Sequence, residues 1–126
     1  MVKSNIKTSN LINYKTTILI YNILRDLGLI STLKGTKFLN KAIQIVLNSD
    51  NEFIILEDVY KKIALSYTNF NSVQVRNAIK YAIDNRYEEK SIANFERIFG
   101  YKYDNYYFTN KVIIEEIARV VYKKLV

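Results

Sequence analysis

The chain of 126 residues has no cysteine, no histidine and no proline, and it has only three glycines. Without cysteine, the protein has neither a disulfide framework nor a thiolate zinc site. Without histidine, it lacks the commonest general base and the commonest metal ligand in proteins. We therefore expect a protein that is not an enzyme and that holds no metal ion or other cofactor.

Long apolar runs are missing as well. The first residues are polar and contain no apolar run of the signal-peptide kind. No uncharged apolar stretch approaches the roughly 18 residues that a membrane helix needs. We expect a cytoplasmic protein that does not associate with a membrane.

The chain does have a large apolar fraction and an excess of positive charge. Hydrophobic residues make up 49% of it, which suits one compact domain. The formal net charge is +7, and the surplus lies in the first 50 residues. These contain seven bases against two acids (Lys3, Lys7, Lys15, Arg25, Lys34, Lys37 and Lys41 against Asp26 and Asp50). A concentrated basic surplus favours a polyanionic partner, although many domains are basic for solubility alone.

The scarcity of helix breakers predicts an all-α fold. Glycine occurs only at Gly28, Gly35 and Gly100, so these positions should mark the ends of helices or turns. The spacing of apolar residues predicts six helices in a single domain. We expect them from residue 10 or 16 to 27, over 36–48 and 56–67, from 72 onward, and over 91–99 and 109–124. Thr36 is the predicted N-cap of the second helix, and Asn71 or Ser72 that of the fourth.

Two segments fall outside this helical pattern. Residues 1–15 are expected to form a basic N-terminal arm in front of a domain that spans residues 16–126, with the first nine residues loose. The aromatic segment at residues 101–108 is strand-like in composition but is interrupted by Asp104 and Asn105. We expect a loop there, with a small hairpin as the alternative.

Residues 57–87 have the pattern of a helix-turn-helix, in which a short helix and a polar turn precede an amphipathic helix. Five side chains lie off the apolar stripe of the second helix: Gln74, Arg76, Asn77, Lys80 and Tyr81. Arginine can bond guanine, and asparagine or glutamine can bond adenine, while lysine and tyrosine serve bases or phosphates. An ordinary pair of helices with a solvated outer face fits the pattern alone slightly better.

The start of the second helix offers a phosphate site. Backbone N–H groups of Lys34, Gly35 and Thr36, together with the neighbouring Lys37, could hold an anion. A plain glycine turn before a capped helix is the alternative. Further candidates for phosphate contacts are Ser72 and the arm residues Lys3 and Lys7. Stacking of the tyrosines on single-stranded nucleic acid is a separate possibility, but a position in the core or at its rim explains most of them.

Several segments, in order and with nearly collinear spacing, resemble the C-terminal effector domain of the stage-zero sporulation response regulator family. The resemblance covers residues 16–125. Its segments are residues 23–28 and 33–43, a Tyr-x-x-Ile-Ala helix at 60–64, the run 75–83, Phe99-Gly100-Tyr101 and Thr109-Asn110.

The resemblance implies a six-helix domain that binds double-stranded DNA through its third and fourth helices. It also implies tandem binding of two copies and control of transcription through RNA polymerase, with its sigma subunit as the contact. It favours the helix-turn-helix over the ordinary helix pair and strengthens the phosphate role of Lys34 and Gly35. In this interpretation Arg76, Asn77 and Lys80 read the bases, and Gln74 and Tyr81 assist them.

The chain also departs from the family pattern. Only about fifteen residues precede the similar region, so we expect a stand-alone regulator without a receiver domain or phosphorelay control. Where the family has Glu-Arg and then Arg-His, this chain has Arg76-Asn77 and then Lys80-Tyr81. We therefore expect a different DNA sequence preference. A second hypothesis is a protein-interaction module that antagonises a full-length relative or contacts RNA polymerase through the last helix and residues 103–108.

Overall fold

The computed structural model describes residues 6–49 and 53–126, with the side chains of the first helix from Asn13 onward. Within these ranges the protein has six α-helices, one short 3-10 helix and no β-strand. The helices are α1 (Ile6–Asp26), α2 (Lys34–Leu47), α3 (Leu56–Ala64), α4 (Ser72–Asp84), α5 (Glu88–Phe99) and α6 (Asn110–Leu125), with η1 (Asn105–Tyr107) before the last. The all-α prediction is confirmed.

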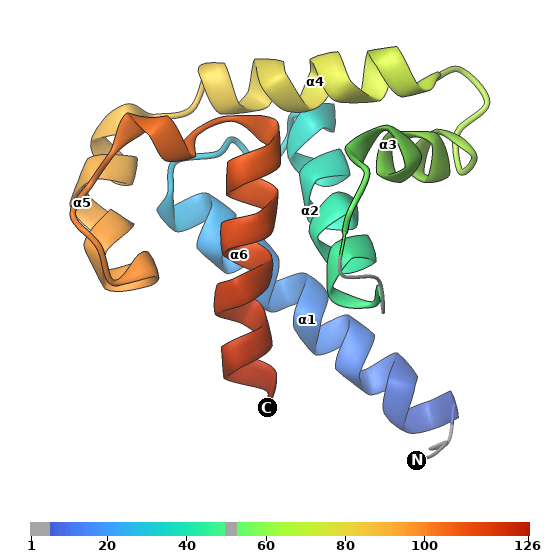
Figure 1. The fold of residues 1–126 in the computed structure, drawn as a ribbon, viewed down its shortest axis with the longest axis horizontal. Coiled ribbons are helices and arrows are strands. Elements are labelled where there is room, and N and C mark those ends of the chain that lie inside the picture. The colour runs from blue at the N-terminus through green and yellow to red at the C-terminus, as the bar shows by residue number, and fades with distance from the viewer. Residues whose placement is uncertain (1–5, 50–52) are drawn as a thin grey trace.

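Helix α4 lies across one edge of the molecule (Figure 1). Helices α2 and α6 run away from it, and α1 crosses the molecule at the opposite edge, where α6 also ends. The closest packing of α4 is against α2 and α3. One face of α4 is therefore supported by the body of the protein, and its other face points outward.

The predicted apolar stripes meet in one core. Val75, Ile79 and Ala82 of α4 are completely buried, as are Phe38 and Ile43 of α2. Burial of such side chains is the main stabilising contribution to a domain of this size. Over the described residues, no helix combines the length and apolar character needed to cross a membrane.

Three helix boundaries differ from the prediction by three residues or more. Helix α1 begins at Ile6, so residues 6–15 are helical where the sequence suggested an arm. No glycine or proline interrupts this segment, and a nucleated helix extends easily. Helix α3 ends earlier, at Ala64, and α5 begins earlier, at Glu88. The two glutamates that open α5 are favoured there by the positive end of the helix dipole.

The predicted N-cap at Thr36 is wrong. Helix α2 begins at Lys34, and its N-cap is Leu33, which makes no side-chain capping bond. Thr36 lies in the first turn with 1% of its surface exposed, and its hydroxyl donates to the carbonyl of Ile30 at 2.7 Å. The threonine hydroxyl therefore holds the loop before α2 and does not cap the N-terminus of that helix.

The predicted roles of two glycines are confirmed. Gly28 and Gly100 follow α1 and α5 with φ angles of 95° and 85°, a conformation that side chains disfavour. The segment at residues 101–108 contains η1 in an otherwise irregular loop, so the loop prediction is confirmed and the hairpin alternative is wrong.

Candidate nucleic-acid interface

The start of α4 is fixed by a capping box. The Asn71 side chain accepts a hydrogen bond from the Gln74 backbone N–H at 2.9 Å, and the Gln74 side chain accepts one from the Asn71 N–H at 2.9 Å. Two of the free N–H groups at this helix end are thus satisfied. The predicted cap at Asn71 is confirmed, and α4 has a sharply defined beginning.

The turn before α4 is held by aromatic packing. The rings of Phe38, Tyr67 and Phe70 contact one another edge-to-face, with centroids 5.1 to 5.9 Å apart. The Lys34 ammonium lies 5.7 Å from the centroids of both Tyr67 and Phe70. This cation–π contact brings the start of α2 to the turn between α3 and α4.

Ser72, the first residue of α4, is tied to α3. Its hydroxyl donates to the Glu57 carboxylate at 2.7 Å. The bond links the first turn of α3 to the first turn of α4. It also leaves the Ser72 oxygen beside a negative charge, which does not favour the predicted phosphate contact at this residue.

One amide joins three helices beneath the outer face of α4. The Asn110 side chain donates to the Tyr60 hydroxyl and to the Arg76 carbonyl, both at 3.1 Å. Tyr60 is 4% exposed, and its burial raises the pKa of the hydroxyl, which keeps the group protonated. Helices α3, α4 and α6 are therefore locked together, with the Arg76 side chain left on the outside.

Gly35 lies where the backbones of α2 and α4 meet. A Cβ at this position would lie 1.8 Å from the carbonyl oxygen of Ala78, so only glycine fits without a shift of one helix. Gly35 is buried, as is Thr36. Burial leaves Gly35 and Thr36 little surface for the predicted phosphate contact, which stays a prediction for the Lys34–Thr36 segment.

The outer face of α4 is exposed along its length. Gln74, Arg76, Asn77, Lys80 and Tyr81 are all exposed. Within the described part of the chain, Arg76 has no ion pair or side-chain hydrogen bond. Lys80 pairs with Asp84 at 2.9 Å, but both groups are more than half exposed. The predicted base-contacting residues thus share one accessible surface, which carries the cations Arg76 and Lys80 among polar side chains.

A hollow of about 360 Å³ runs between α4 and the start of α6. Its charged lining residues are Arg76, Lys80, Asp84 and Lys111, and the aromatic side chains of Tyr60 and Phe108 also line it. Lys111 is exposed and pairs with Glu115 at 2.7 Å. The sequence did not single out Lys111, because only the packing of α6 brings it beside the fourth helix.

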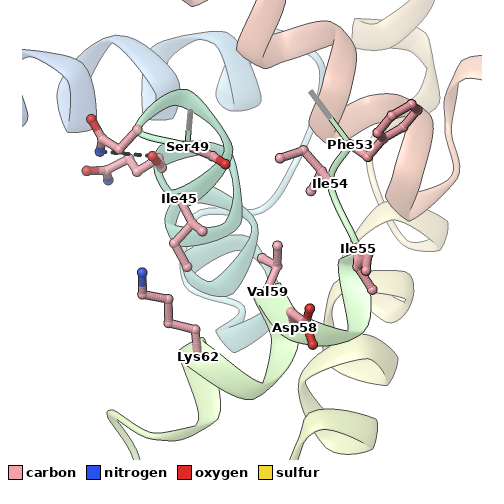
Figure 2. Close-up of a pocket in the computed structure, with 10 residues that line it drawn as sticks. Ile45, Ser49, Phe53, Ile54, Ile55, Asp58, Val59 and Lys62 are labelled. Atoms are coloured by element: carbon pink, nitrogen blue, oxygen red, sulfur yellow. Dashed lines mark hydrogen bonds between the residues drawn. The ribbon is translucent and has the colours of Figure 1, made fainter. Parts of the chain in front are cut away.

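A second hollow, of about 590 Å³, lies between the end of α2 and the start of α3 (Figure 2). Its lining mixes apolar residues, such as Ile45, Ile54 and Val59, with polar ones, and its charged groups among the described residues are Asp58 and Lys62. One carboxylate and one ammonium within that part of the chain give the hollow no preference for a polyanion.

The remaining predicted contacts divide into two groups. Lys34 and Lys37 are exposed in the first turn of α2, and no ion pair within the described residues engages either of them. Lys3 lies outside the described residues. Lys7 belongs to α1, but its side chain lies outside those described. The exposed basic groups of the candidate interface therefore come from α2, α4 and α6.

The fold and this face define an all-helical domain in which α4 presents Arg76, Asn77 and Lys80 to solvent. Residues 20–121 match the family model described as the C terminal of the sporulation initiation factor Spo0A, and the chain belongs to that family. The protein is thus a member of a DNA-binding family that regulates transcription. Among solved protein structures, none matches the chain.

Proposed function

We propose that this protein recognises specific sequences in double-stranded DNA, with α3 and α4 acting as a helix-turn-helix and α4 entering the major groove. The observation that carries the proposal is the exposed outer face of α4, where the Arg76 side chain has no ion pair or hydrogen bond within the described residues. A major groove about 12 Å wide accepts such a helix. Family membership supports DNA binding in general, and this face supplies the chemistry for sequence preference.

Arg76, Asn77 and Lys80 are the proposed base-reading residues. Arginine offers a fork of donors to guanine, and the asparagine amide matches the donor and acceptor of adenine. Tyr81, with 59% of its surface exposed, is placed to assist. The oxygen of the Gln74 side chain accepts the capping-box bond, and its NH₂ group is left to donate to DNA.

Lys34 and Lys37 are the proposed phosphate contacts, and Lys111 extends the basic surface on the side of α6. Lys34 is already oriented by the rings of Tyr67 and Phe70. Such contacts fix the position of a protein on the duplex without reading sequence. Each neutralised phosphate releases counterions and makes binding weaker at high salt.

The proposal is tested by selecting bound duplexes from a random pool at two salt concentrations. We expect one enriched sequence motif, with the affinity for it falling as salt rises. An unenriched pool at low salt would overturn sequence-specific binding. An enriched motif that is bound with the same affinity at both salt concentrations would contradict the assigned phosphate contacts.

Family membership supports two finer proposals. Two copies bind adjacent sites in tandem, and the bound protein acts on RNA polymerase through its sigma subunit. Band-shift titration of duplexes with one or two selected sites tests the first, because tandem binding predicts a second, cooperative complex. Transcription in vitro from a promoter that carries the selected site, with and without the protein, tests the second.

Exposed tyrosines favour the alternative of a protein-interaction module. Tyr106 in η1 is 70% exposed and Tyr122 in α6 is 59% exposed. Capture of a full-length relative or of RNA polymerase, without binding to any duplex at low salt, would establish this alternative. Selection of a duplex motif would exclude it as the sole function.

A further inference from the structure

Val73 is an apolar side chain on the outer face of α4. It lies in the first turn of the helix with 49% of its surface exposed, and it does not belong to the core. Arg76, Asn77 and Lys80 follow it at spacings of three, four and seven residues, and residues so spaced share one face of a helix. Val73 therefore stands in line with the proposed base-reading residues, at the end where α4 begins.

The fold does not require valine at this position. The capping box uses Asn71 and Gln74, and the buried stripe begins with Val75, which is completely buried. Valine also has a lower helix propensity than alanine or the long polar residues. An exposed apolar residue is ordinary by itself, but here it interrupts a face made of hydrogen-bonding and cationic groups.

The chemistry of the major groove gives this side chain a partner. Residues at the N-terminal end of a recognition helix contact base edges. Thymine is the base that presents a methyl group in the major groove, and small apolar side chains recognise that methyl by contact. We propose that Val73 is a specificity-determining residue that selects thymine through its 5-methyl group. This inference rests on the proposed binding of α4 in the major groove.

The test replaces each thymine of the selected duplex, one at a time, by deoxyuridine, which removes only the methyl group. We expect one replacement to weaken binding of the unaltered protein about fourfold, the effect of losing one buried methyl contact. The Val73→Ala variant should bind the thymine and uracil duplexes equally, with an affinity near that of the unaltered protein for the uracil duplex.

Ile92→Ala is the matched control, because Ile92 is 55% exposed but lies on α5. This variant should keep the preference for thymine. A selected duplex whose thymine methyl groups are all dispensable would overturn the role of Val73 while leaving DNA binding intact. Retention of the thymine preference by Val73→Ala would overturn that role as well. Failure to select any duplex would overturn the proposed function and this inference together.

Discussion

Arg76 lies within α4 and Arg86 lies just beyond its end, and the structure uses these two arginines in opposite ways. Arg76 projects from the outer face of α4 into solvent. The Arg86 side chain, just beyond the end of α4, is 7% exposed, and its guanidinium carbon lies 3.7 Å from the centroid of the Phe108 ring. It donates to the Ser91 hydroxyl at 2.8 Å and to the Ile83 carbonyl at 3.0 Å.

The same guanidinium reaches the loop before α6. It donates to the Tyr103 hydroxyl at 3.2 Å and to the Asn105 side-chain oxygen at 3.0 Å. Arg86 thus joins the end of α4, the start of α5 and the η1 segment. A buried charge is tolerated only when its donors are satisfied, and this one is stacked and hydrogen-bonded on several sides. The contrast shows that one arginine holds the fold while the other is available to a partner.

Replacing Arg86 by alanine tests the structural half of this contrast. The Arg86→Ala variant should lose about 3 kcal/mol of unfolding free energy, because several charge-assisted hydrogen bonds and the ring contact disappear together. Urea unfolding followed by circular dichroism measures the loss. A loss below about 1 kcal/mol would show that the buried network contributes little net stability.

Two glycines, Gly35 beneath α4 and Gly100 after α5, differ in the same way in how closely they are packed. Gly35→Ala places a methyl group against the Ala78 carbonyl and should cost about 3 kcal/mol, since backbone must move. Gly100→Ala is the control, because the new Cβ would have no atom of the described residues within 4 Å apart from its chain neighbours. It should cost only about 1 kcal/mol, for the positive φ. Equal losses in thermal or urea unfolding would contradict the close approach of α2 and α4.

Replacing Arg76 by alanine tests the functional half. The free energy of unfolding should change by less than about 0.5 kcal/mol, because the side chain is exposed. The affinity for the selected duplex should fall by about 1–3 kcal/mol, with preference lost at one base pair. Fluorescence anisotropy with variant duplexes measures both. Unchanged affinity and preference would remove Arg76 from the interface.

Lys37→Ala should have a smaller and more uniform effect. Binding to all duplexes should weaken alike, and the slope of log affinity against log salt should fall by about one, as for a single lost phosphate contact. Lys124 provides the control, because it lies in the last turn of α6, and that end of α6 points away from α4 (Figure 1). A Lys124→Ala variant should keep the original slope. An equal change in both variants would mean that net charge alone drives binding.

Asp84→Asn should have the smallest effect and the opposite sign. The change frees Lys80 from its ion pair and removes a negative charge from the outer face of α4. We expect up to about threefold tighter duplex binding at low salt, and almost none of this gain at high salt, because exposed pairs are weak and screened. Weaker binding by this variant would indicate that Asp84 itself contacts DNA.

Local chemistry made much of the fold predictable. The cap at Asn71 and the turn glycines at Gly28 and Gly100 depend on residues near them in sequence. The apolar stripe from Val75 to Ile83 follows from helical spacing alone and is buried as predicted, with only Ala78 partly exposed. The exposed set on α4 follows from the same spacing.

Long-range contacts were not predictable from local patterns. Gly35 was expected in a turn, but its reason for being glycine is a backbone 43 positions away at Ala78. Thr36 looked like a cap because threonine is favoured at that position. Its hydroxyl instead donates to the Ile30 carbonyl in the preceding loop. Arg86 gave no signal, because a lone arginine after a helix normally remains solvated. Only packing distinguishes such residues from their surface counterparts.

The contact of Gly35 with the back of α4 has an evolutionary consequence. Support for this helix comes from one side, and the residues proposed to choose the DNA sequence lie on the other. Val73, Asn77 and Lys80 can therefore be exchanged without disturbing how the helix is seated. Related domains can diverge in their target sites while keeping one scaffold, and an engineer could randomise the same positions to direct this protein to a new operator.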